Sequence, residues 1–140
     1  MKIVIETIPH DQHRYPTCGD WFKTDDGVIH IRVSDLGNWR EELLIAVHEL
    51  VEWAKCTQDG VTQEQVDRFD TTFEEARESA LCDPAIAEKE KALIAIEEPG
   101  DSYNAPYRQQ HCLATGIERI LAAALNVCWS DYEKKLEALP

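Results

Sequence analysis

The segment His48-Glu49-Leu50-Val51-Glu52 carries the residues with the clearest capacity for chemistry. Side chains four residues apart lie on one face of a helix, so His48 and Glu52 are expected to point at the same spot. An imidazole and a carboxylate are both acceptable ligands for zinc or iron. Glu49 follows the first ligand directly and is placed to take a proton from a water molecule. The spacing therefore predicts a metal site with a neighbouring general base.

A later helix, predicted over about residues 107–126, is expected to supply a third ligand, His111. On a helical projection His111 and Glu118 lie at the edge of a broad apolar arc, nearly aligned with Tyr107. Two histidines and one carboxylate with an open position suit catalytic zinc or non-haem iron. Glu118 would orient a ligand, and Arg108 and Tyr107 are candidates for contacting substrate.

The helix that carries the motif divides into two sides. Its predicted core face is one apolar stripe, made by Leu43, Val47, Leu50 and Ala54. The opposite side mixes carboxylates and His48 with Ile45 and Trp53, which a purely solvated face would not need. We therefore expect a second element to cover part of that side. Buried carboxylates need a partner, and a metal ion is a common one.

A short strand, VIHIRVS, followed by a helix bearing HExx resembles the catalytic half of a zincin metallopeptidase, over about residues 27–56. The resemblance implies that His48 and Glu52 are metal ligands and that Glu49 activates the water. The motif of that family ends in histidine, whereas this chain has Glu52 there. The implied function is a metal-dependent hydrolase of a small-molecule or peptide substrate, with zinc favoured and iron or magnesium as alternatives.

A second resemblance competes with the first. All-alpha nucleoside triphosphate pyrophosphatases hold magnesium with an ExxE on one helix and an ExxD on another. Glu49-x-x-Glu52 is similar to the first half, and Glu75-x-x-Glu78 imitates the second. This resemblance implies Mg²⁺ bound by carboxylates.

The order of the predicted elements, sheet first and helices afterwards, is typical of an α+β fold. We expect one domain over residues 1–140, with a small N-terminal antiparallel sheet of about three strands on a four- to five-helix bundle. The strands are expected at 2–8 and in a hairpin with its turn at Asp25-Asp26-Gly27. The helices are expected over residues 39–56, 63–80, 84–96, 107–126 and 131–138. The Pro99–Pro106 loop is the expected hinge or lid.

The net charge of −13, from 14 Lys and Arg against 27 Asp and Glu, disfavours nucleic-acid and membrane-surface partners. A third hypothesis is therefore a non-enzymatic acidic interaction protein, of phage or mobile-element type. The five cysteines are scattered and form no CxxC pair, and the start of the chain is unlike a signal peptide. These features predict a cytoplasmic protein. They do not indicate an oligomeric state.

Overall fold

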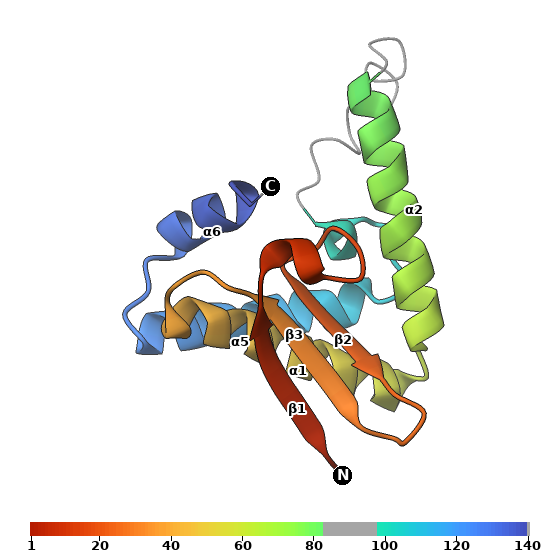
Figure 1. Cartoon of the computed structure of the whole chain (residues 1–140), viewed down its shortest axis with the longest axis horizontal. Helices are drawn as coiled ribbons and strands as arrows, with labels where there is room; N and C mark the ends of the chain where they lie inside the picture. The colour runs from red at the N-terminus through yellow and green to blue at the C-terminus, as the bar shows by residue number, and fades with distance from the viewer. Residues whose placement is uncertain (83–97, 140) are drawn as a thin grey trace.

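The computed structural model describes residues 1–82 and 98–139 and has an α+β fold. A three-stranded sheet at the N-terminus is followed by four described α-helices, with α1 and α5 on one face of the sheet (Figure 1). The elements are β1 (Ile3–Ile8), η1 (His10–Gln12), β2 (Gly19–Lys23), β3 (Ile29–Ser34), α1 (Trp39–Asp59), α2 (Gln63–Cys82), η2 (Pro99–Asp101), α5 (Arg108–Ala124) and α6 (Trp129–Glu137). The helix expected over 84–96 lies outside the described residues.

The sheet is mixed, so the prediction of an antiparallel sheet is wrong in one detail. β2 and β3 form the expected antiparallel hairpin, and Gly27 at its turn has a φ of 84°. β1 instead pairs in parallel with β3, giving the order β1-β3-β2. Because β2 takes the far edge, the chain between β1 and β2 must cross the end of β3 before the hairpin begins. Local turn signals cannot indicate that crossing.

Helix α1 begins at Trp39, where the sequence predicts, and ends at Asp59, three residues after the predicted end. Asn38 caps its start by accepting a hydrogen bond from the backbone N–H of Arg40 at 3.2 Å. Glu42 completes the cap, because its Oε1 accepts a hydrogen bond from the backbone N–H of Asn38 at 3.2 Å. Gly60 ends the helix in the left-handed region, with a φ of 78°. The caps fix the register that presents His48 and Glu52 to the interior.

The other described helices lie close to their predicted positions. Thr62 caps α2 through reciprocal hydrogen bonds with Gln65 of 3.3 Å and 2.8 Å. Helix α6 begins two residues before the predicted start, and Cys128 is its N-cap residue. In the part of the chain that the structure describes, no helix combines the length and apolar character needed to cross a membrane.

The core forms around α1, which packs against both the sheet and α5. Ile31 and Val33 of the central strand pack there with Leu44 of α1 and Ala122 of α5. Tyr132 of α6 is also fully buried and closes one end of the core. Both helices that carry the predicted ligands are therefore held by apolar packing next to the site.

Candidate metal centre

Helix α1 buries its polar side, contrary to the predicted core face. Its buried residues are Leu44, Ile45, Ala46, His48, Glu52 and Cys56. The predicted apolar stripe is half-buried at Leu43, Val47 and Leu50, and Ala54 is exposed. The sheet and α5 both pack against the side that holds His48 and Glu52, where each polar group finds a partner. Hydrophobic periodicity cannot identify a face whose polar groups pair across elements.

Helix α5 is the second element that the sequence led us to expect over this side. It runs antiparallel to α1, since His111 meets Glu52 whereas Glu118, further along α5, meets His48, which precedes Glu52. Ala114 and Ala122 are 0% and 1% exposed, so the two helices approach closely through small side chains. This packing brings two residues 63 positions apart, His48 and His111, into direct contact.

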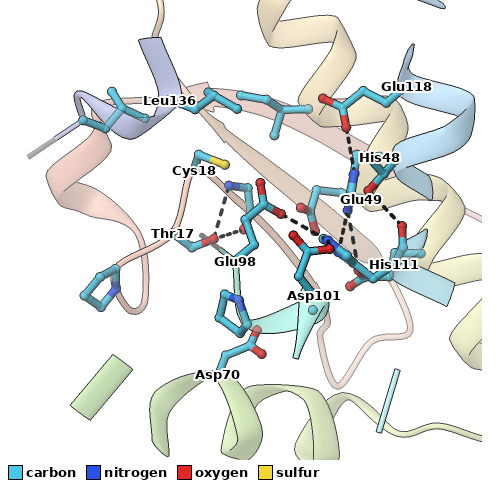
Figure 2. A pocket seen from close by; sticks show the side chains of 18 of the residues that line it. Thr17, Cys18, His48, Glu49, Asp70, Glu98, Asp101, His111, Glu118 and Leu136 are labelled. Atoms are coloured by element: carbon cyan, nitrogen blue, oxygen red, sulfur yellow. Dashed lines mark hydrogen bonds and ion pairs between the residues drawn. The ribbon is translucent and has the colours of Figure 1, made fainter. Parts of the chain in front are cut away.

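His48 and His111 meet between α1 and α5 (Figure 2), and Glu52 adds a third ligand atom beside them. His48 Nε2 lies 3.1 Å from His111 Nδ1, His111 Nδ1 lies 3.2 Å from Glu52 Oε2, and His48 Nε2 lies 3.6 Å from the same oxygen. A tetrahedral zinc with bonds of about 2.0–2.1 Å separates its ligand atoms by about 3.3–3.4 Å. The three predicted ligands therefore have the mutual spacing of a tetrahedral metal site.

Outer partners hold this arrangement in place. Glu118 Oε2 lies 2.9 Å from His48 Nδ1, and Glu118 Oε1 accepts a hydrogen bond from Tyr132 at 2.6 Å. The indole N–H of Trp21 donates to Glu52 Oε1 at 3.0 Å, leaving Oε2 for the cluster. Metal-binding histidines and carboxylates are characteristically oriented in this way by a second set of hydrogen bonds. Glu118 thus contacts the ring of His48 directly.

The loop that contains η2 contributes residues that the sequence did not identify. Glu98 and Asp101 place carboxylate oxygens 3.3 Å and 3.6 Å from His111 Nε2. Gly100 lies against the same ring, where an added Cβ would be 2.3 Å from Cγ of His111. The loop expected to be a lid therefore packs on the imidazole at this end. The available signal was a glycine flanked by acids in the segment EEPGD.

His48 and His111 also form a second group with Glu98. One ligand atom from each residue lies within 4.8 Å of the other two. Glu98 is about half exposed and comes from a loop, whereas Glu52 is buried on the same helix as His48. Glu98 lies against Nε2 of His111, whereas the triangle with Glu52 uses Nδ1, so the two groups are alternative arrangements around His111.

The general-base candidate Glu49 lines the same pocket, as Figure 2 shows. Its Oε1 lies against Gly19, where an added Cβ would be 2.5 Å away. No hydrogen bond or ion pair engages its carboxylate within the described residues. Burial, and then the charge of Glu52, raises the pKa of Glu49 well above its usual range. A carboxylate with a raised pKa and no fixed partner is a stronger base than an ordinary glutamate.

Negative charge exceeds positive charge in this cluster. Five carboxylates surround the two imidazoles: Glu49, Glu52, Glu98, Asp101 and Glu118. No lysine or arginine among residues 1–82 and 98–139 forms an ion pair with any of them. A divalent cation would reduce the resulting repulsion.

The field of these carboxylates also changes the titration of the rings. Burial lowers the pKa of His48, but hydrogen bonds with Glu118 and Glu52 raise it well above its usual value. Burial likewise lowers the pKa of His111, and the bond with Glu52 raises it overall. Only one proton fits between the facing nitrogens of the two rings. The site therefore favours positive charge but cannot accommodate it fully as protons.

The remaining predicted site residues take different positions. Tyr107 is buried, its ring lies edge-on to His111, and its hydroxyl donates to Asp70 of α2. Its hydroxyl is thus committed to a neighbour rather than to substrate. Arg108 is exposed, and its Nε donates to the backbone oxygen of Asp101 at 3.4 Å. Glu75 and Glu78 are exposed on α2 and are not among the residues that line the pocket with Glu49 and Glu52.

Asp70 provides a test of the electrostatics beside the site. Burial raises the pKa of its carboxyl from 3.8 to about 7, although Tyr107 donates to it. The folded protein therefore loses stability as the pH rises toward 7, because the unfolded chain ionises more readily. We therefore compare the free energy of unfolding of Asp70→Asn with that of the wild type. The difference between them should shift in favour of the variant by about 2 kcal/mol between pH 5.5 and 8.5. Urea unfolding in the presence of a chelator measures it.

The control for that experiment is Asp59→Asn. Hydrogen bonds from Lys55 and Gln110 hold the pKa of Asp59 below its usual value, so its titration lies below this pH window. The difference in free energy of unfolding between Asp59→Asn and the wild type should stay constant from pH 5.5 to 8.5. If the difference for Asp70→Asn is also independent of pH, the raised pKa of Asp70 is contradicted.

The site opens into a pocket of about 410 Å³ between the sheet, η2, α2 and α6. Trp129, Leu136 and Leu139 give one side of it an apolar lining, and acidic side chains line much of the rest. This volume is within the range of sites for small ligands.

Comparisons with protein-family models, curated proteins and solved structures found no match to this chain. Function is therefore inferred from the geometry of the site.

Proposed function

We propose that this protein is a metal-dependent hydrolase, similar to the zincins, in which His48, Glu52 and His111 hold the metal. The observation that carries the proposal is the triangle of ligand atoms, with edges of 3.1, 3.2 and 3.6 Å. Outer partners orient His48 and Glu52, as in known metal sites. Two imidazoles with one carboxylate favour zinc, or iron, over magnesium.

The proposed reaction divides among a few residues. A divalent metal at this site would supply Lewis-acid chemistry to a water or to a carbonyl oxygen. Glu49 takes the proton of the attacking water and later delivers it to the leaving group. Trp21 and Glu118 keep Glu52 and His48 in place during these steps. The pocket accommodates a small molecule or a segment of peptide.

The acidic pocket also bears on the alternatives. Phosphate chemistry would require carboxylates from two helices around magnesium, but Glu75 and Glu78 lie on the exposed side of α2. The two arginines of the pocket, Arg77 and Arg119, already pair with Glu74 and Glu133. Both features favour an uncharged or cationic substrate over a nucleoside triphosphate.

We also propose a cytoplasmic location, in keeping with five free cysteines.

Metal analysis of the purified protein tests the proposal. We expect about one zinc ion per chain after preparation with zinc, and less retention of iron or magnesium. Removal by a chelator should lower the melting temperature and abolish hydrolysis of a peptide library, and added zinc should restore both. No bound metal after zinc or iron supplementation would overturn the proposal. Magnesium-dependent release of pyrophosphate from nucleotides would favour the alternative enzyme. Binding to a partner without any turnover would favour an interaction protein.

A further inference from the structure

Within residues 1–82 and 98–139 the sheet has one free edge, strand β1. In the order β1-β3-β2 the opposite edge, β2, is joined to α2 by a hydrogen bond from Lys23 N–H to Gln63 at 2.9 Å. β1 pairs only with β3 in the described part of the chain and lies at the outside of the sheet (Figure 1). Ile5 in the middle of β1 is 51% exposed. An apolar edge strand of this kind is a template for pairing with another strand.

The outward groups of β1 can be assigned from its parallel pairing. The backbone oxygen of Lys2 accepts from Ile29 at 3.1 Å, and that of Ile8 accepts from Asp35 at 2.8 Å. Backbone groups alternate in direction along a strand, so even-numbered residues face β3. The N–H and C=O groups of Ile3, Ile5 and Thr7 consequently face the free edge.

We propose that β1 pairs antiparallel with β1 of a second copy of this chain, forming a symmetric dimer with a continuous six-stranded sheet. The register places Ile3 opposite Ile5 of the second copy, and Lys2 opposite its Glu6. Odd-numbered residues must meet odd-numbered residues, because only they present hydrogen-bonding groups at this edge. The two-fold axis then passes between the two Val4 residues, and every contact occurs twice.

Charge complementarity selects this register and this partner. Lys2 and Glu6 lie on the same face of β1 and would form two ion pairs across the axis. If the two-fold axis passed between the two Ile5 residues, Glu6 would lie opposite Val4 and lose its ion pair. If the axis passed between the two Glu6 residues, their carboxylates would lie opposite each other and repel. Glu6 has a side chain 45% exposed and lies 3.7 Å from Arg32 on the same sheet face, so it is accessible. The strand is thus complementary to itself.

Charge substitutions distinguish this pairing from other modes of association. Sedimentation of the full chain over a concentration series should show a monomer–dimer equilibrium, since one strand pair buries little surface. Lys2→Glu and Glu6→Lys each place two like-charge pairs across the axis. Each should raise the dissociation constant of the dimer about tenfold or more. The double variant restores opposite charges and should recover the dimer.

Proline substitution tests the edge itself. Ile5→Pro removes an N–H that faces the free edge, so it should abolish the dimer while the circular dichroism spectrum is kept. Val4→Pro is the matched control, because it removes an N–H that faces β3 and should destabilise the sheet. A chain that is monomeric at every concentration overturns the proposal. A dimer unaffected by Ile5→Pro and by both charge variants overturns it as well.

Discussion

His111→Ala is expected to lower the zinc affinity of this protein by more than the roughly 10- to 100-fold typical of losing an outer partner. The imidazole supplies one of three converging ligand atoms, at 3.1 Å from His48 Nε2 and 3.2 Å from Glu52 Oε2. Without it, His48 and Glu52 keep their outer partners but hold the metal with only two groups. Zinc titration against a competing chelator measures the change, and His48→Ala should have a similar effect.

Two further variants make this experiment specific. His30→Ala is the matched control, because His30 stacks on Phe22, outside the cluster, and its loss should leave zinc affinity unchanged. Gly100→Ala retains all ligands but places a Cβ 2.3 Å from the ring of His111, so it should weaken zinc binding by displacing that ring. Equal zinc affinity in His111→Ala and His30→Ala would show that the cluster is not the metal site.

Glu49→Gln is expected to reduce the hydrolytic rate by about 10²- to 10⁴-fold, the usual contribution of a general base. Glutamine has nearly the same shape but cannot accept the proton. Because Glu49 has no hydrogen bond or ion pair within the described residues, the change should keep the metal content, and because burial disfavours its charge the melting temperature should not fall. The measurement is kcat on the best peptide from the library, together with zinc content.

The matched control for Glu49→Gln is Glu41→Gln on the same helix. Glu41 forms an ion pair with Lys135 at 2.6 Å, far along α1 from the cluster, so its loss should not affect turnover. Full activity in zinc-loaded Glu49→Gln would show that Glu49 is not the general base. Loss of zinc together with activity would instead make Glu49 a ligand.

Much of the fold follows from local signals. Asn38 and Gly60 cap the ends of α1, and Thr62 begins α2, because a cap depends on residues adjacent in the sequence. The turn at Gly27 likewise defines the β2–β3 hairpin. The parallel pairing of β1 with β3 did not follow, since it depends on which edge of a strand remains available after the hairpin forms.

The candidate site was predicted only in part. His48, Glu52, His111 and Glu118 meet as their helical positions suggested. The contributions of Trp21 and Gly100 were not predicted, because they come from a strand and a loop with no spacing relation to the motif. Apolar periodicity also indicated the wrong side of α1 as its core face. It counts polar groups as exposed and ignores partners on other elements.

The sequence by itself determined the α+β order of elements, the helix that carries the motif, and which residue types could bind a metal, because these depend on neighbours within a turn or two of chain. Only the tertiary structure decided that His48 and Glu52 are buried, that α5 brings His111 to within 3.2 Å of Glu52, and that η2 closes on the same ring. Those features arise from the packing of distant segments. Burial becomes favourable only once each polar group has its partner in place.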